Sequence, residues 1–183
     1  MGYKNGYTGE ELASKAEYMT SLNGNSLVYK NHPQIILRGY LDELKSKILV
    51  YMWELEQQKK ESILRDFHEI LVWVKLLQRH EVTGEPMRDV RFNDMDLEEI
   101  RNVSHNPKKY YNLEHLFDLK HDENIDVLKI NELRAFTRRI EIVAFDAFFD
   151  GGNVTHEDFL TVMNRLSSVF YIVELKIISG REK

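Results

Sequence analysis

Cysteine is absent from this sequence of 183 residues, which also contains only three prolines and nine glycines. Without cysteine these residues offer no disulfides, thiolate metal sites, iron–sulfur clusters or cysteine nucleophiles, and they suit a reducing compartment. Proline and glycine most often interrupt regular structure, so their scarcity indicates long, continuous elements. The longest proline-free stretches are residues 34–85 and 108–183.

An excess of positive charge is also missing, since 25 lysine and arginine residues face 30 aspartate and glutamate residues, a net charge of −5 at pH 7. Nucleic-acid binding would need a local basic patch, so we expect no nucleic-acid partner and only small, locally bound anions. No apolar run reaches the ~18 residues of a membrane span, and the first residues contain no signal-peptide core. We therefore expect a soluble, cytoplasmic protein without a membrane partner.

The apolar residues that are present recur at three- and four-residue steps, which is helical spacing. With 43% hydrophobic and 30% charged residues, the chain can bury one core and solvate its surface, as a single domain of ordinary size does. We predict a short helix from Thr8, with Glu11 as capping-box partner, to about Thr20. The first long helix is expected to begin at Pro33, and the second to carry an apolar stripe over residues 63–77 and to end before Gly84. Two more are expected over residues 125–149 and 155–179, the last with the Thr155 side chain as its cap.

The predicted fold class is therefore all-α, a bundle of five helices. Residues 1–25 are assigned to an N-terminal short helix and loop, and residues 26–183 to the helical bundle. Residues 87–125 mix short helical signals, such as Asp94 ahead of Leu97, with punctuation such as Asn106-Pro107. We predict an irregular, partly helical connection there, and its length favours a functional role.

A charged stripe runs along the helix predicted for residues 125–149. At 100° per residue, Arg134, Arg138 and Glu141 fall within about 60° of one another, with Phe145 continuing the stripe. The face predicted for the core comprises Phe136, Ile140, Val143 and Ala147. Two guanidinium groups one turn apart, ordered by a carboxylate, can bind a triphosphate bidentately. A solvated face with ordinary intrahelical ion pairs is the alternative, and spacing alone does not decide between the two.

The helix predicted for residues 155–179 is also two-sided. Its apolar side comprises Phe159, Leu166, Phe170, Val173 and Ile177. Its other side presents Asn164, Ser168 and Tyr171, uncharged hydrogen-bonding groups that suit a sugar or an amide-fringed ligand. Asparagine and serine are not favoured inside helices, which indicates a reason for keeping them, although plain surface exposure is the alternative.

Several blocks of the sequence resemble the ATP:cob(I)alamin adenosyltransferases. The main pair is residues 132–141, Glu-Leu-Arg-Ala-Phe-Thr-Arg-Arg-Ile-Glu, and residues 163–168, Met-Asn-Arg-Leu-Ser-Ser. Residues 30–33 and 39–44 are similar to the Lys-Asp-Pro and Gly-x-x-Asp-Glu-Leu segment of the propanediol-utilisation type. Residues 84–86, 104–110 and 164–171 look like the ethanolamine-utilisation type, to which the chain is closest. The resemblance covers residues 26–179 in order.

The resemblance implies a five-helix bundle that forms a homotrimer and binds ATP between adjacent subunits. The implied reaction transfers the 5′-deoxyadenosyl group of ATP to the cobalt of a reduced corrinoid (cobalamin) and releases triphosphate, with Mg²⁺ accompanying ATP. Because the cobalt is the nucleophile, no serine, cysteine or histidine nucleophile is required. The protein must orient the C5′ atom and neutralise the leaving triphosphate, which positioned cations do best in a dry site.

The family motifs also imply roles for individual residues. Arg134 and Arg138 would hold the phosphates, and Glu141 would order these two arginines. Lys30 would add a phosphate contact, and Asn164 would bind the nucleotide.

Four further residues are candidates for binding ATP or the corrinoid. Arg139 and Asp42 lie within the matching motifs. In the family an apolar group displaces the lower axial ligand of the corrinoid, and Phe67 and Phe145 are the candidates for that group.

The sequence departs from the family patterns at several points. It lacks the N-terminal Thr-Gly-Asp-x-Gly phosphate loop of the propanediol-utilisation type and the cysteine cluster of some ethanolamine-utilisation enzymes. Ile142 stands where an arginine often follows the motif glutamate. His115 and His121 are six residues apart and do not share a helical face, so we expect no protein metal site.

Three functions are compatible with these features. The first is a corrinoid adenosyltransferase of ethanolamine or related B12-dependent catabolism, with a B12-dependent lyase or a reductase as protein partner and an association with a bacterial microcompartment. The second is a non-catalytic relative that carries or regulates a corrinoid or nucleotide. The third is a structural helical protein whose polar stripes are subunit contacts.

Overall fold

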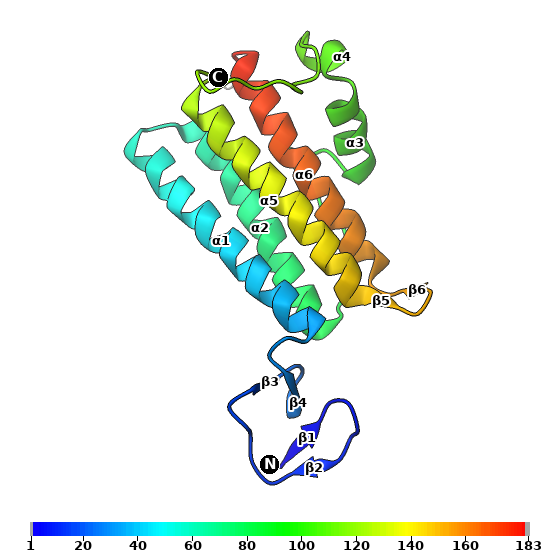
Figure 1. Ribbon diagram of the computed structural model, residues 1–183. Coiled ribbons are helices and arrows are strands. Elements are labelled where there is room, and N and C mark those ends of the chain that lie inside the picture. The colour runs from blue at the N-terminus through cyan, green and yellow to red at the C-terminus, as the bar shows by residue number, and fades with distance from the viewer. Residues whose placement is uncertain (1, 182–183) are drawn as a thin grey trace.

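Four long helices form the body of the protein in the computed structural model, which describes residues 2–181 (Figure 1). They are α1 (Pro33–Gln57), α2 (Glu61–Thr83), α5 (Ile125–Phe148) and α6 (Glu157–Ile178). α1 packs against α2 and α5, and α6 packs against the same two helices, so the four helices enclose one core. The shorter helices α3 (Leu97–His105) and α4 (Pro107–Tyr111) pack against the outside of α6.

The long helices confirm the helical part of the sequence prediction. α1 begins at Pro33, where the side chain of His32 accepts a hydrogen bond from the Gln34 amide at 3.3 Å. α2 begins just before the predicted stripe and, as predicted, ends before Gly84, which has the left-handed φ of 67° that glycine adopts without strain. The apolar stripe predicted for α2 is fully buried: Ile63, Phe67, Ile70, Val74 and Leu77. No helix within residues 2–181 is both long and apolar enough to cross a bilayer.

The N-terminal segment contradicts the all-α prediction, and the helix predicted from Thr8 to Thr20 is wrong. This segment forms a four-stranded sheet in the order β2-β1-β4-β3, made of β1 (Tyr3–Asn5), β2 (Glu11–Leu12), β3 (Met19–Ser21) and β4 (Ser26–Tyr29). The side chain of Asn5 accepts from the amides of Tyr7 and Thr8, and the Thr8 hydroxyl accepts from the Glu10 amide. The polar residues that suggested a helix cap therefore build the turn between β1 and β2.

Arg38 links the sheet to the bundle through side-chain hydrogen bonds. Arg38 on α1 donates to the backbone oxygens of Ser21 and Leu22, and pairs with both carboxylate oxygens of the buried Glu81 on α2, at 2.8 and 2.9 Å. β4, which begins at residue 26, pairs in parallel with β1 and antiparallel with β3. One sheet therefore contains strands from both sides of the predicted boundary between residues 25 and 26. The division of the chain at that residue stays a prediction.

The core face of α5 differs from the predicted one. Its buried apolar residues are Val127, Ile130, Leu133, Ile140, Ala144 and Phe148. Of the predicted set only Ile140 is buried, whereas Phe136, Val143 and Ala147 are half-buried. α5 packs against α6 on one side and α1 on the other, so its buried line runs between these neighbours, and Phe136 lies at the α1 side, 6.0 Å from the ring of Tyr40.

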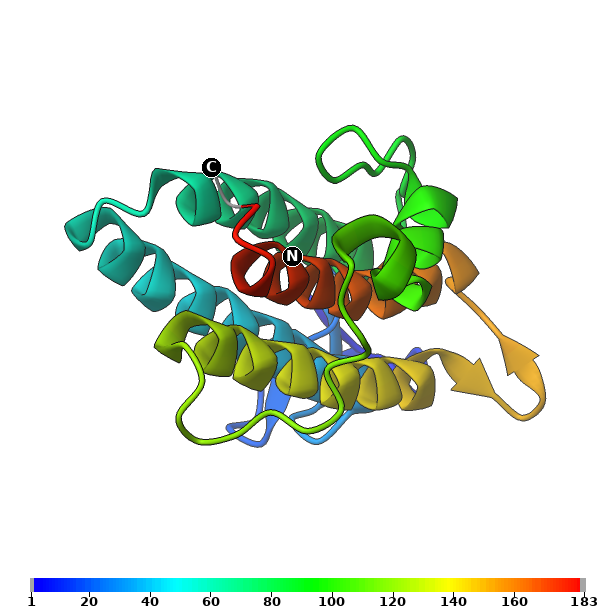
Figure 2. The same cartoon turned by 90° about the horizontal axis from the view of Figure 1, so that it is seen from above.

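The connection between α2 and α5 is irregular and partly helical, as predicted (Figure 2). α3 is capped by Asp96 rather than Asp94, through a capping box with Glu99. A short hairpin of β5 (Phe149–Asp150) and β6 (Asn153–Val154) joins α5 to α6. The predicted cap of α6 by Thr155 is wrong, because the Thr155 hydroxyl donates to the Phe148 carbonyl across this hairpin.

Candidate functional site

A polar pocket of about 650 Å³ lies between α5, α6 and residues 104–117. It is lined from α5 by Arg134, Arg138 and Glu141, and from α6 by Asn164, Ser167, Ser168 and Tyr171. The two polar stripes predicted on separate helices therefore face the same pocket. Its volume lies within the roughly 300–1,000 Å³ that small-molecule sites occupy.

Arg134 is held at the pocket by three neighbours. Its Nη2 donates to the Asn131 side-chain oxygen at 2.7 Å, and its Nε lies 3.2 Å from a carboxylate oxygen of Glu174 on α6. The guanidinium carbon is 5.7 Å from the centre of the Tyr171 ring, a cation–π distance. An arginine has five N–H donors, so these contacts fix the side chain and leave donors for a ligand.

Arg138 lies one turn further along α5 and is exposed on the pocket. No residue between 2 and 181 forms a hydrogen bond or ion pair with its side chain, which distinguishes it from Arg134. Its five donors are therefore available to an anion, and a guanidinium binds phosphate oxygens in pairs.

Glu141 reaches the pocket but contacts Asn164 rather than the arginines. The Asn164 amide donates to a Glu141 carboxylate oxygen at 2.7 Å, and Arg165 donates to the Asn164 side-chain oxygen at 2.6 Å. Arg165 in turn donates to the Leu97 carbonyl at the start of α3. The predicted ordering of the two arginines by Glu141 is thus not seen among the described contacts, and Glu141 orients the Asn164 amide instead.

The third side of the pocket comes from the irregular segment between α4 and α5. The Leu116 amide donates to the Tyr171 hydroxyl at 3.0 Å. The ring of His115 lies nearly parallel to that of Tyr171, at 6.3 Å between centroids, and Phe117 stacks on His115 at 5.1 Å. The Phe117 side chain is 89% exposed, so a flat aromatic surface is presented at the edge of the pocket.

Three other predicted residues do not line this pocket in their own chain. Lys30 is exposed directly after β4. Asp42 is exposed on α1, where it pairs with Lys45 at 3.1 Å. Arg139 points toward α1, where it donates to the Tyr40 hydroxyl at 3.0 Å and lies over the Tyr40 ring.

The two phenylalanine candidates have different environments. Phe67 is fully buried between the rings of Tyr51 and Phe170, so its side chain packs in the core and is not exposed to a ligand. Phe145 is 44% exposed near the end of α5 and stacks on Phe149 at 5.2 Å between centroids. The ring of Phe145 is thus accessible to a ligand or a neighbouring subunit.

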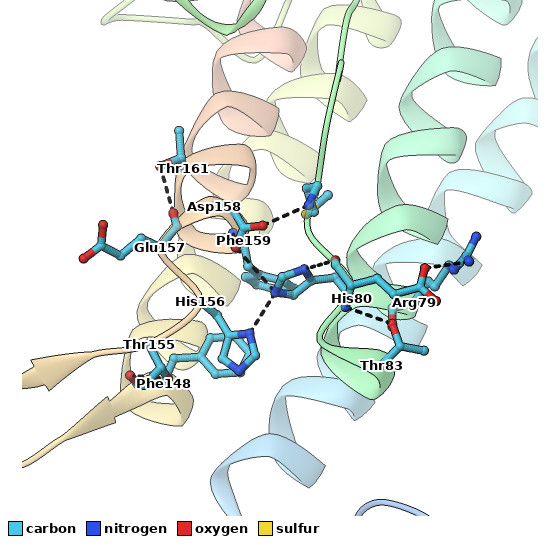
Figure 3. A network of polar contacts seen from close by, with 12 residues as sticks. Arg79, His80, Thr83, Phe148, Thr155, His156, Glu157, Asp158, Phe159 and Thr161 are labelled. Atoms are coloured by element: carbon cyan, nitrogen blue, oxygen red, sulfur yellow. Dashed lines mark hydrogen bonds and ion pairs between the residues drawn. The ribbon is translucent and has the colours of Figure 1, made fainter.

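A second polar cluster joins the end of α2 to the start of α6 (Figure 3). His80 Nε2 and His156 Nδ1 are 2.8 Å apart, and the other ring nitrogen of His80 lies 2.7 Å from the Glu85 carbonyl. Asp158 accepts from the Met87 amide and lies 3.6 Å from His80 Nε2. Burial and the neighbouring His80 lower the pKa of His156.

No group of three or more histidine, aspartate and glutamate residues suited to a metal occurs within residues 2–181.

Comparison with known proteins identifies the family. A family model described as cobalamin adenosyltransferase matches residues 14–177. The chain belongs to this family. The corrinoid adenosyltransferase EutT of Escherichia coli strain K12 is 28% identical over 166 residues, and EutT of Salmonella typhimurium strain LT2 is 26% identical over the same length. These matches cover 90% of this chain and 60% of each relative, so the chain spans about 60% of their length.

Glu174, a buried residue of this adenosyltransferase-family chain, lies next to the pocket and was not predicted as a site residue. Glu174 has no exposed surface and pairs with Arg134 beneath the pocket. Burial raises the pKa of its carboxyl to about 7, against the opposing effect of the Arg134 charge. The signal was present, because Glu174 lies one turn beyond Phe170 on the predicted apolar face, where a carboxylate needs a partner.

Proposed function

We propose that this chain is a corrinoid adenosyltransferase, which transfers the 5′-deoxyadenosyl group of ATP to the cobalt of a reduced corrinoid. The observation that carries the proposal is the pair Arg134 and Arg138, which line one pocket in a member of this family. The names of the EutT relatives support a corrinoid as the acceptor. The sequence resemblance supports a role in ethanolamine or related B12-dependent catabolism.

In this proposal the protein supplies position and charge. The cobalt–carbon bond forms as the bond between C5′ and the triphosphate oxygen breaks, and the electron pair of the broken bond stays on the triphosphate. Arg138 and the free donors of Arg134 stabilise that developing charge. The amide of Asn164, oriented by Glu141, and the hydroxyl of Ser168 bind the nucleoside.

Mg²⁺ is part of the same proposal. Magnesium usually keeps several water ligands and binds through substrate phosphates together with one or two carboxylates. Residues 2–181 contain no dedicated cluster of metal ligands. The ion would therefore be carried mainly by the triphosphate of ATP.

We also propose a homotrimer with the site completed by an adjacent subunit, as the family resemblance implies. Lys30 and Asp42 are exposed and do not line the pocket of their own chain, so a neighbouring copy would present them. The outer side of α1 supports a subunit contact, because Val50 and Trp53 are each 62% exposed there. Val50 also lines a mostly apolar groove of about 390 Å³ between α1 and α5.

The test incubates the protein with ATP, Mg²⁺ and chemically reduced cobalamin and follows the light-sensitive product, adenosylcobalamin. The proposal expects product from the wild type and from Arg65→Ala, since Arg65 is an exposed α2 residue without polar contacts among the described residues. It expects little from Arg138→Ala. A spectral shift of bound Co(II) corrinoid without any product would indicate a carrier, and neither signal would leave only a structural protein.

A further inference from the structure

Glu174 is the buried charged group with the fewest polar partners among the described residues. Its side chain has no exposed surface, and neither carboxylate oxygen accepts a well-aligned hydrogen bond. Its one ion-pair partner is Arg134, whose Nε lies 3.2 Å from one oxygen. That partner is a pocket residue, 24% of whose side chain is exposed.

The other buried carboxylates of this bundle show that the arrangement is unusual. Glu81 receives two donors from Arg38 at 2.8 and 2.9 Å. Asp66 receives the Lys176 ammonium on both oxygens, at 2.6 and 2.7 Å, and the Asn93 amide as well. Glu81 and Asp66 thus accept hydrogen bonds on both carboxylate oxygens, whereas neither oxygen of Glu174 does.

Few other charges act on Glu174. Among the described residues, the charged α5 side chain within ion-pair distance of Glu174 is Arg134, which is also bonded to the side chain of Asn131. On its own helix, Tyr171 is close enough for the Glu174 charge to contribute to the raised pKa of the Tyr171 phenol, which burial raises most. Lys176 is committed to Asp66 on α2. The charge of Arg134 is thus what opposes protonation of this buried carboxylate.

We propose that Glu174 is a positioning residue that holds Arg134 at the pocket and takes up one proton from solvent when a nucleotide polyphosphate binds there. The proposal rests on the proposed function, in which this pocket receives ATP. A bound polyphosphate places a second set of negative charges around the same guanidinium. Two anions then share one cation in a site of low dielectric, so the buried Glu174 carboxylate takes up a proton and becomes neutral.

Binding should then become weaker as the pH rises. Burial already raises the pKa of Glu174 to about 7, so at pH 8 the carboxyl is mostly ionised before binding and available to accept a proton. The γ-phosphate does not contribute at this pH, because the second ionisation of a phosphate ester lies near 6. A linked uptake of about one proton raises the Kd up to about tenfold per pH unit.

The experiment is isothermal titration of the protein with MgATP at pH 8 in two buffers that differ in ionisation enthalpy, Tris and HEPES. The wild type is expected to take up close to one proton per ATP, and Glu174→Gln close to none. Glu157→Gln, which changes an exposed carboxylate on the same helix, is expected to match the wild type. Equal binding heats in both buffers for the wild type would overturn the inference and leave ATP binding intact.

Three further outcomes are decisive. His105 and His115 also line the pocket, and an uptake that survives in Glu174→Gln but disappears when either histidine is changed to glutamine would overturn the assignment. The glutamine variant is uninformative if it lacks the helical circular dichroism of the wild type. In that case the Kd of the wild type for MgATP is measured between pH 8 and pH 9. A Kd that stays constant over this range overturns the proposal. Absence of any ATP binding by the wild type would instead refute the proposed function.

Discussion

Replacing Glu174 by glutamine should change how the stability of the protein depends on pH, even without a ligand. Burial raises the pKa of this carboxyl from 4.5 to about 7, so the folded chain binds the proton more tightly than the unfolded chain. The stability linked to this group is therefore fully present below pH 4.5 and is lost as the pH rises through 7. A shift of roughly 2.5 units at about 1.4 kcal/mol per unit amounts to about 3 kcal/mol.

The assay is urea unfolding followed by far-UV circular dichroism, from pH 5 to pH 9, at one fixed protein concentration because subunit association would also stabilise the fold. The free energy of unfolding of Glu174→Gln, relative to that of the wild type, is expected to increase by about 2.5 kcal/mol across this range, because part of the total loss occurs below pH 5. Glu157→Gln, an exposed change on the same helix, should follow the wild type. Parallel pH profiles for the wild type and Glu174→Gln would refute the reasoning.

Three other substitutions test separate parts of the structure. Arg138→Ala is expected to lower kcat/KM for ATP by about 100-fold or more while the helical circular dichroism stays unchanged, because it removes a contact to the leaving triphosphate; full activity would contradict the phosphate assignment. Phe67→Ala should cost about 3–5 kcal/mol in urea unfolding, since Phe67 is a core side chain, and a loss below about 1 kcal/mol would contradict that placement. Gly84→Ala should cost about 1 kcal/mol, because its φ of 67° strains any L-residue, and a more stable variant would argue against this cap.

The parts of the fold that sequence reasoning predicted depend on local periodicity. The stripe from Ile63 to Leu77 repeats at helical spacing and is buried along its whole length. Asn164, Ser168 and Tyr171 could be assigned to one face of a helix for the same reason, and that face lines the pocket with Arg134. In each case the relevant neighbours lie within one or two turns of a single helix.

The parts that were missed depend on contacts between distant segments. The sheet at residues 3–29 requires β1 to pair in parallel with β4, and the residues around Thr8 contain no local pattern that predicts this pairing. The core face of α5 was misplaced because its buried line depends on the positions of α1 and α6. The stack of His115 and Phe117 on Tyr171 comes from an irregular segment, whose apolar residues show no helical or strand periodicity.

The most direct test of the central claim is calorimetric titration of the wild-type protein with MgATP. The structure places two arginines in one polar pocket, one of them without a polar partner among residues 2–181, so saturable heat is expected from the wild type and from Arg65→Ala. That heat should be largely lost in Arg138→Ala. No measurable heat with the wild type, or undiminished heat with Arg138→Ala, would contradict the assignment of this pocket to the triphosphate.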